Sequence, residues 1–212
     1  MQKLLASVGA SVLLAWSLGP AWADVDEMPA LVPVCALCHG DTGPSPFSGV
    51  PTIHGLPHGV IDSALFSYQR GLRPCRVSEC SKVGTCPDMN MCDIVYGMTH
   101  EIRQELGAWY AAQPFPKHQD PYDPELAARG RELHDRYCEV CHTGYGSDPV
   151  DDASMLRGQR KVYLRTALED FREGKRSIGI PAMDGRIRTF SDGDLDALAE
   201  FYSGPAAYPL DD

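Results

Sequence analysis

At 212 residues, the chain is long enough for one large domain or two small ones, because typical domains contain about 100 to 200 residues. Its 29 acidic side chains outnumber the 19 basic ones, which gives a formal net charge of −10 at pH 7. This charge argues against nucleic acid as a partner. It suits a partner with a basic patch, although acidity is also an ordinary solubility feature.

Residues 1–23 predict a secretory signal peptide. Lys3 supplies the positive start, an apolar run follows, and Ala21 and Ala23 form a small-x-small cleavage site. The apolar run is shorter than the roughly 20 residues that span a bilayer, and charges and prolines interrupt every later one. We therefore expect the mature chain to begin near Asp24, to lie in the periplasm and not to span the membrane.

An internal repeat divides the remaining sequence. The pattern Cys-x-x-Cys-His at residues 35–39 recurs 103 positions later at residues 138–142. The same offset pairs Ile61 with Leu164, Leu65 with Leu168, Tyr68 with Phe171, Gly71 with Gly174 and Arg73 with Arg176. The chain therefore contains two half-domains with one plan.

The offset falls to 92 after Arg73. It then pairs Met91 with Met183, Thr99 with Ser191, Leu106 with Leu198 and Tyr110 with Tyr202. The first half thus contains 11 additional residues between Arg73 and Met91, in a segment rich in cysteine.

In the first half, the spacing of Ile61, Leu65 and Tyr68 predicts one face of a helix that stops at Gly71. The spacing of the apolar residues between positions 102 and 110 predicts a final helix, for which Thr99 is a suitable N-cap.

Residues 114–124 contain four prolines, so neither a helix nor a central strand is expected to cross them.

The second half repeats the pattern of the first. Leu164, Leu168 and Phe171 predict a helix that stops at Gly174, and a final helix follows the N-cap Ser191. Strand alternation is weak throughout, so the predicted fold class is all-α, with two tandem domains. The predicted limits are 24–113 for the first domain with a Cys-rich insertion at 74–92, 114–124 for the Pro-rich linker, and 125–212 for the second domain.

The two Cys-x-x-Cys-His motifs predict two covalently attached haem c groups. In this motif the thiols can bond to the haem vinyl groups, and the adjacent imidazole is brought beneath the iron. An isolated Cys-x-x-Cys also suits a redox disulfide or zinc, but the histidine, the repetition and the export signal favour haem. The attachment residues are Cys35, Cys38, Cys138 and Cys141, and the proximal iron ligands are His39 and His142.

The repeat also selects candidates for the second axial ligand, for which methionine is expected because its thioether raises the reduction potential. Of the seven methionines, Met91 and Met183 both lie eight positions before the predicted N-cap of a final helix. Met89 remains a rival to Met91, whereas Met98 and Met155 are expected to pack in the core.

Four further cysteines, Cys75, Cys80, Cys86 and Cys92, lie in or beside the insertion. In an oxidising compartment four clustered cysteines most often form two disulfides, and three pairings are open. The competing reading is a zinc or iron–sulfur site, although spacings of five, six and six residues do not match the usual zinc pattern. The other histidines, expected on the surface or in ordinary hydrogen bonds, are His54, His58, His100, His118 and His134.

Residues 156–159 (Leu-Arg-Gly-Gln), 163–164 and 170–176 resemble the signature of the two-domain, two-haem cytochromes of the cytochrome c4 class. Residues 133–142 also resemble the two-haem subunit of flavocytochrome c sulfide dehydrogenase. The resemblance implies electron transfer between paired haems whose propionates face one another across the domain interface. The cysteine-bearing insertion departs from both families.

The main functional hypothesis is an electron-transfer protein or subunit without substrate chemistry of its own, since two strong axial ligands leave no open iron position. Its candidate redox partners are a flavoprotein sulfide dehydrogenase subunit, a terminal oxidase or another cytochrome. The alternative is a catalytic dihaem cytochrome of the thiosulfate dehydrogenase or peroxidase type. A redox or metal sensor built on the four-cysteine segment is a third hypothesis.

Overall fold

A computed structural model describes residues 28–77, 79–116, 118–177 and 179–204. The predicted signal peptide, residues 1–23, lies outside the described residues. Within the described part the chain is helical, and its only β pairing is an isolated bridge between Val77 and Asn90. The prediction of an all-α fold is confirmed. None of the described helices combines the length and the apolar character needed to cross a bilayer.

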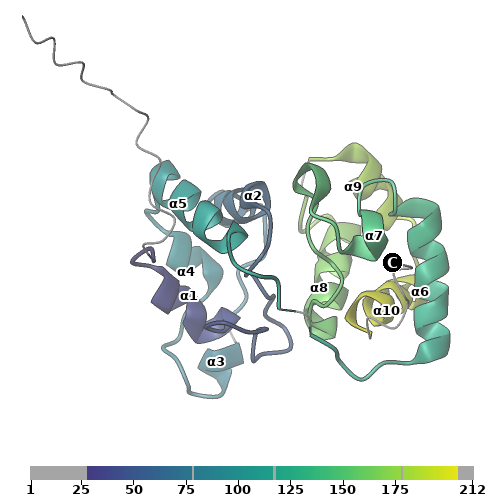
Figure 1. The fold of residues 1–212 in the computed structure, drawn as a ribbon, viewed down its shortest axis with the longest axis horizontal. Helices are drawn as coiled ribbons and strands as arrows, with labels where there is room; N and C mark the ends of the chain where they lie inside the picture. The colour runs from purple at the N-terminus through teal and green to yellow at the C-terminus, as the bar shows by residue number, and fades with distance from the viewer. Residues whose placement is uncertain (1–27, 78, 117, 178, 205–212) are drawn as a thin grey trace, which may run out of the picture.

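The helices form two groups that lie side by side and are joined by an extended segment (Figure 1). The first group consists of α1 (Val32–His39), α2 (His58–Gln69), α3 (Glu79–Lys82), α4 (Met91–Val95) and α5 (His100–Ala111). The second consists of α6 (Pro124–Tyr137), α7 (Thr143–Gly146), the 3-10 helix η1 (Val150–Asp152), α8 (Lys161–Arg172), α9 (Pro181–Ile187) and α10 (Asp192–Ser203). The two groups correspond to the two halves of the sequence repeat.

The helix ends fall where the repeat predicts them. Helices α2 and α8 both end two residues before a glycine, and Gly71 (φ 66°) and Gly174 (φ 69°) adopt the left-handed conformation that glycine tolerates best. Helix α5 begins after Thr99, whose hydroxyl accepts a hydrogen bond from the Ile102 amide. Helix α10 begins after Ser191 with a complete capping box.

The final helix of each half lies at the centre of an apolar core. Leu106 and Tyr110 of α5 are 1% exposed and belong to the first core, beside residues of α2. Leu198 and Tyr202 of α10 hold the same repeat positions in the second core and are equally buried. Residues at equivalent positions of the sequence repeat therefore pack at equivalent positions of the two cores.

Specific polar contacts join the two halves. The Thr52 amide donates to Gln159 Oε1 (2.9 Å), and Gln159 Nε2 donates back to the Thr52 carbonyl (2.7 Å), with both residues buried. Arg76, from the insertion, donates to both carboxylate oxygens of the buried Asp170, at 2.7 and 2.5 Å. Met155 packs in the core of the first half, although it follows the second haem motif in the sequence.

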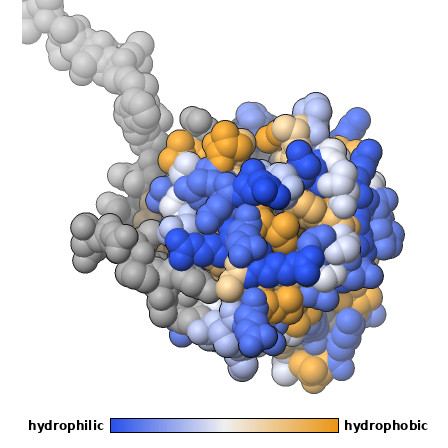
Figure 2. Space-filling view, turned by 90° about the vertical axis from the view of Figure 1, so that its right-hand side faces the viewer, coloured by the Kyte–Doolittle hydropathy of each residue, from blue (hydrophilic) through white to orange (hydrophobic). Residues whose placement is uncertain are grey.

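The outer face of the second half, on the side of α6, is covered mostly by hydrophilic side chains with apolar groups between them (Figure 2). This pattern agrees with the position of α6, whose buried residues face α10 and the second core.

Candidate haem sites

The first Cys-x-x-Cys-His motif lies on α1, so one helix carries both thiols and the histidine. The His39 ring is 7% exposed, and its Nδ1 lies 2.8 Å from the carbonyl oxygen of Pro51. If Nδ1 carries the proton and donates to this carbonyl, Nε2 keeps its lone pair, which is the tautomer that an iron ligand requires. Burial lowers the pKa of His39, so the neutral ring is favoured.

The second motif follows the end of α6, and His142 is the N-cap of the single turn α7. Its Nδ1 is buried and has no hydrogen-bond partner within the described residues. Burial lowers the pKa of His142, while the backbone carbonyl of Ser154 opposes this shift. Ser154 is the repeat equivalent of Pro51, so the two candidate iron ligands, His39 and His142, lie near equivalent backbone positions.

The thiols of the two motifs differ in exposure. Cys35, Cys38 and Cys138 are half-buried, whereas Cys141 is exposed. Burial raises the pKa of Cys35 and of Cys138, so both favour the thiol form. Tyr110 and Tyr202, equivalent in the repeat, partly offset this effect on Cys35 and Cys138 respectively.

The candidate methionines lie against the same cores as the haem thiols. In the first half Cys35 and Met91 both pack against the first core, and in the second half Cys138 and Met183 both pack against the second. Met89 is half-buried and is not part of that apolar cluster. These placements favour Met91 over Met89 on grounds of packing.

The two methionines expected in the core are buried as predicted. Met98 is 7% exposed and Met155 is 8% exposed, and both belong to the core of the first half.

Two repeat-equivalent arginines lie near one another at the boundary between the halves. The guanidinium of Arg73 lies 4.5 Å from the ring centre of Tyr68, and that of Arg176 lies 4.4 Å from the ring centre of Phe171. Neither arginine forms an ion pair with a carboxylate in the described part of the chain, and the Nε of Arg176 is buried without a partner there. Burial lowers the pKa of Arg176, and the charge of Arg73 lowers it further.

Tyr163 interacts with both arginines, and their positive charges change its pKa. Burial raises the pKa of Tyr163, but the charges of Arg176 and Arg73 more than offset this and lower it to about 8. Two cations with no carboxylate partner form a site that would accept anionic groups, and haem propionates are such groups.

His54 differs from the sequence-based expectation of a surface or hydrogen-bonded histidine. It is 3% exposed, and neither ring nitrogen has a hydrogen-bond partner among the described residues. Its ring instead makes edge contacts with Trp109 and Tyr110, at centroid distances of 6.1 and 5.2 Å. His54 matches Arg157 in the repeat, and the structure shows both residues buried, but the pairing of a histidine with an arginine gave no sign of this in the sequence.

His134 forms hydrogen bonds, as expected for the remaining histidines, but its position beside the second haem motif was not predicted from the sequence. It is fully buried, and its Nδ1 lies 2.8 Å from the Tyr202 hydroxyl, while its Nε2 contacts the Glu139 carboxylate. Glu139 lies inside the second haem motif. The first half has Leu31 and Ala36 at the equivalent positions, so only the second site has this network.

The four insertion cysteines are paired as Cys75–Cys92 and Cys80–Cys86. This pairing leaves no set of four thiolates for a zinc ion or an iron–sulfur cluster. The insertion is held against the first haem motif, since α3 contacts α1.

The comparisons with known proteins agree with these sites. No family model matches the sequence. The chain is 26% identical over 217 residues to cytochrome c4 of Stutzerimonas stutzeri, which covers 96% of this chain and 99% of the relative. The crystal structure of reduced recombinant cytochrome c4 from Pseudomonas stutzeri matches with a TM-score of 0.65 and 25% identity, covering 82% of this chain and 94% of that one.

This chain is similar to the two-domain dihaem cytochromes named cytochrome c4. It carries two covalently bound haem c groups and transfers electrons. The chain is also 25% identical over 180 residues to a thiosulfate dehydrogenase electron acceptor of Stutzerimonas stutzeri (strain A1501), which covers 80% of this chain and 77% of that protein.

Proposed function

We propose that this c4-class cytochrome is a periplasmic electron carrier whose irons are both held between a histidine and a methionine. His39 and Met91 would ligate the first iron, and His142 and Met183 the second. Cys35 and Cys38, and likewise Cys138 and Cys141, would form the thioether bonds within domains spanning residues 24–113 and 125–212. The observation that carries this proposal is the packing of each methionine against the same core as the first cysteine of its motif.

The ligand set determines what the haems can do. Haem supplies reversible one-electron chemistry when it is bound. Two strong axial ligands leave no position for a substrate, so the protein's part is to hold the group, exclude water from it and set its potential. His39 contributes by donating its Nδ1 proton to the Pro51 carbonyl, which fixes the ring and increases the basicity of Nε2.

Arg73 and Arg176 would hold the haem propionates at the boundary between the halves. They lie close enough for each to lower the pKa of Tyr163, and they have no carboxylate partner in the described chain. Negative propionates would compensate both charges. The positive field would also favour the reduced iron, which carries one positive charge less than the oxidised iron.

A protein donor would dock where each attachment site reaches the surface. Leu37 is 48% exposed and Val140 is 84% exposed, and each is the residue just before the second cysteine of its motif. An exposed apolar group surrounded by polar ones is typical of transient protein contacts. The similarity to a thiosulfate dehydrogenase electron acceptor favours a dehydrogenase of inorganic sulfur compounds as the donor, and a flavoprotein sulfide dehydrogenase is the second candidate.

The donor can be identified by affinity isolation of the full chain from its native host. We expect a sulfur-compound dehydrogenase to co-purify and to reduce the isolated cytochrome when its substrate is added. Co-purification with a terminal oxidase alone, with no reduction by any sulfur-oxidising fraction, would contradict this donor.

The axial ligands are tested by replacing Met91 and Met183 with alanine, one at a time. Each variant should lose the near-infrared sulfur-to-iron band of one haem and keep that of the other, because only one thioether is removed. The potential of the altered haem should also fall, since methionine favours the reduced iron.

Met89→Ala is the matched control, because Met89 lies two residues from Met91 and is also half-buried. We expect both near-infrared bands to persist in this variant. Loss of the first-haem band in Met89→Ala and its retention in Met91→Ala would reverse the assignment. A high-spin haem with rapid cyanide binding in the wild-type chain would instead favour a catalytic cytochrome.

A further inference from the structure

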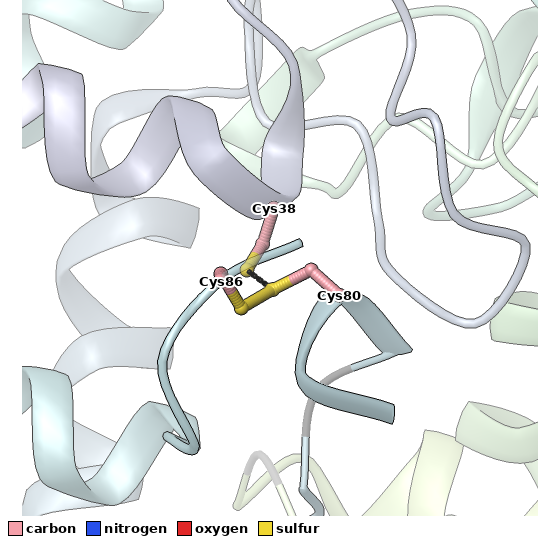
Figure 3. Close-up of side chains that lie close together, drawn as sticks. All are labelled: Cys38, Cys80 and Cys86. Carbon is pink, nitrogen blue, oxygen red and sulfur yellow. Dashed lines mark hydrogen bonds between the residues drawn. A yellow bond between two sulfur atoms is a disulfide. The ribbon is translucent and has the colours of Figure 1, made fainter. Parts of the chain in front are cut away.

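Three sulfur atoms meet beside the first haem motif (Figure 3). Cys38 Sγ, from α1, lies 2.9 Å from Cys80 Sγ, from α3, and Cys80 is bonded to Cys86. All three sulfurs lie within 4.8 Å of one another. One member of this cluster is a haem-attachment thiol and the other two form a disulfide of the insertion.

The fold holds the disulfide in this place. The carboxylate of Glu79, the first residue of α3, accepts a hydrogen bond of 2.9 Å from the Gly49 amide. A Cβ atom at position 49 would lie 2.5 Å from Glu79 Oε1, so a larger residue there would displace the Glu79 carboxylate. Helix α3 is thereby fastened to the loop that follows the first haem motif, and α3 also contacts α1.

Access to the two disulfide sulfurs is unequal. Cys80 is completely buried, whereas Cys86 is half-buried. A thiol in solution therefore cannot reach Cys80, but the neighbouring Cys38 sulfur is already in contact with it. Thiol–disulfide exchange depends on which sulfur the attacking thiolate can reach. Cys38 is the thiol of this chain that is placed to attack Cys80.

We propose that the haem-free chain undergoes intramolecular thiol–disulfide exchange among Cys38, Cys80 and Cys86. The Cys38 thiolate attacks Cys80 Sγ, a Cys38–Cys80 bond forms, the Cys80–Cys86 bond breaks, and its electron pair leaves on Cys86 as a thiolate. The number of disulfides is unchanged, so the step needs no oxidant or reductant. Attack by Cys86 on Cys80 reverses it.

The exchange controls the availability of one haem-attachment thiol. A sulfur held in a disulfide cannot form a thioether, so Cys38 is protected in one state and available in the other. Formation of the thioether removes Cys38 from the exchange and fixes Cys80 and Cys86 as a pair. The second half has no cysteines besides those of its haem motif, so Cys141 has no neighbouring disulfide with which to exchange. This inference rests on the proposed role of Cys38 in haem attachment.

The exchange can be observed in the full chain exported from cells that lack haem attachment. After rapid alkylation, digestion without reduction and mass spectrometry, we expect two populations. One has a Cys80–Cys86 bond with Cys38 alkylated, and the other has a Cys38–Cys80 bond with Cys86 alkylated. Complete absence of Cys38–Cys80 peptides would overturn the proposal.

A variant pair tests the consequence in haem-loaded protein. In Cys86→Ser, Cys80 loses its partner, and the disulfide-forming oxidant of the export compartment should oxidise the Cys38 and Cys80 thiols to a disulfide, so most chains should lose the thioether at Cys38. In Cys80→Ser/Cys86→Ser the same native disulfide is absent but Cys38 has no sulfur beside it, and the thioether should return to the wild-type fraction. This double variant separates trapping from a general failure to fold.

The second haem is an internal control in both variants, and its thioethers should be retained. A Cys86→Ser protein with a wild-type fraction of Cys38 thioether and an alkylatable Cys80 would overturn the exchange and leave the electron-carrier function intact. Absence of thioethers from both motifs of the wild-type chain would contradict the haem-attachment residues themselves.

Discussion

At the scale of single residues, the two arginines at the boundary between the halves connect structure and function most closely. Arg73 and Arg176 hold equivalent repeat positions, lie over equivalent aromatic rings and together lower the pKa of Tyr163 to about 8. Two like charges in a poorly hydrated place are costly unless anions compensate them. Their retention in the fold is explained if each one pairs with a haem carboxylate.

Replacing either arginine with glutamine should lower the reduction potentials, on the order of tens of millivolts, because loss of a nearby positive charge favours the oxidised iron. Potentiometric titration of Arg73→Gln and Arg176→Gln measures the shift. Arg129→Gln is the control, since Arg129 is an exposed residue paired with Asp194. Unchanged potentials in both Arg73→Gln and Arg176→Gln would show that these arginines do not act on the haems.

At the scale of helices, the second half depends on a close crossing of α6 and α10. A Cβ atom on Gly130 of α6 would lie 2.0 Å from the carbonyl oxygen of Ala197 in α10. Ala197 is fully buried, and α6 and α10 share an extensive contact. The backbone of one helix therefore approaches the other through a position that only glycine can occupy without displacement.

Gly130→Ala should destabilise the second domain by up to about 2 kcal/mol, because overpacking costs about 1 to 3 kcal/mol and the gain in helix propensity offsets roughly 1 kcal/mol. Thermal unfolding followed by circular dichroism measures this loss. Gly185→Ala in α9, where a Cβ would meet no atom within 4 Å, should leave stability equal or slightly raised. Equal stability of the two variants would contradict the close helix crossing.

The sequence predicted those elements whose signals are local. Periodic apolar residues, stop glycines and capping side chains located α2, α5, α8 and α10, because each signal acts within a few turns of one helix. The pairing of Cys75 with Cys92 could not be chosen from three pairings, because it depends on how the insertion packs. The burial of His54 without a hydrogen-bond partner was not predicted, because the rings that contact it, Trp109 and Tyr110, belong to the final helix of the first half, far along the chain.

At the scale of the whole molecule, contacts distant in the sequence join the two halves. The reciprocal pair of hydrogen bonds between Thr52 and Gln159 and the Arg76–Asp170 ion pair connect them, and Met155 packs into the first core. Gln159 belongs to the motif that carries the resemblance to the cytochrome c4 class, and the structure gives that motif a role at the interface. The insertion contributes Arg76 and so helps to fix the two haem domains relative to each other.

The central claim is that one chain carries two haems that each accept and release one electron. An anaerobic reductive titration of the purified full chain, followed by the low-spin α-band, tests it most directly. We predict that the band reaches its maximum after two electrons per chain, with no high-spin component. Saturation after one electron per chain would contradict the claim.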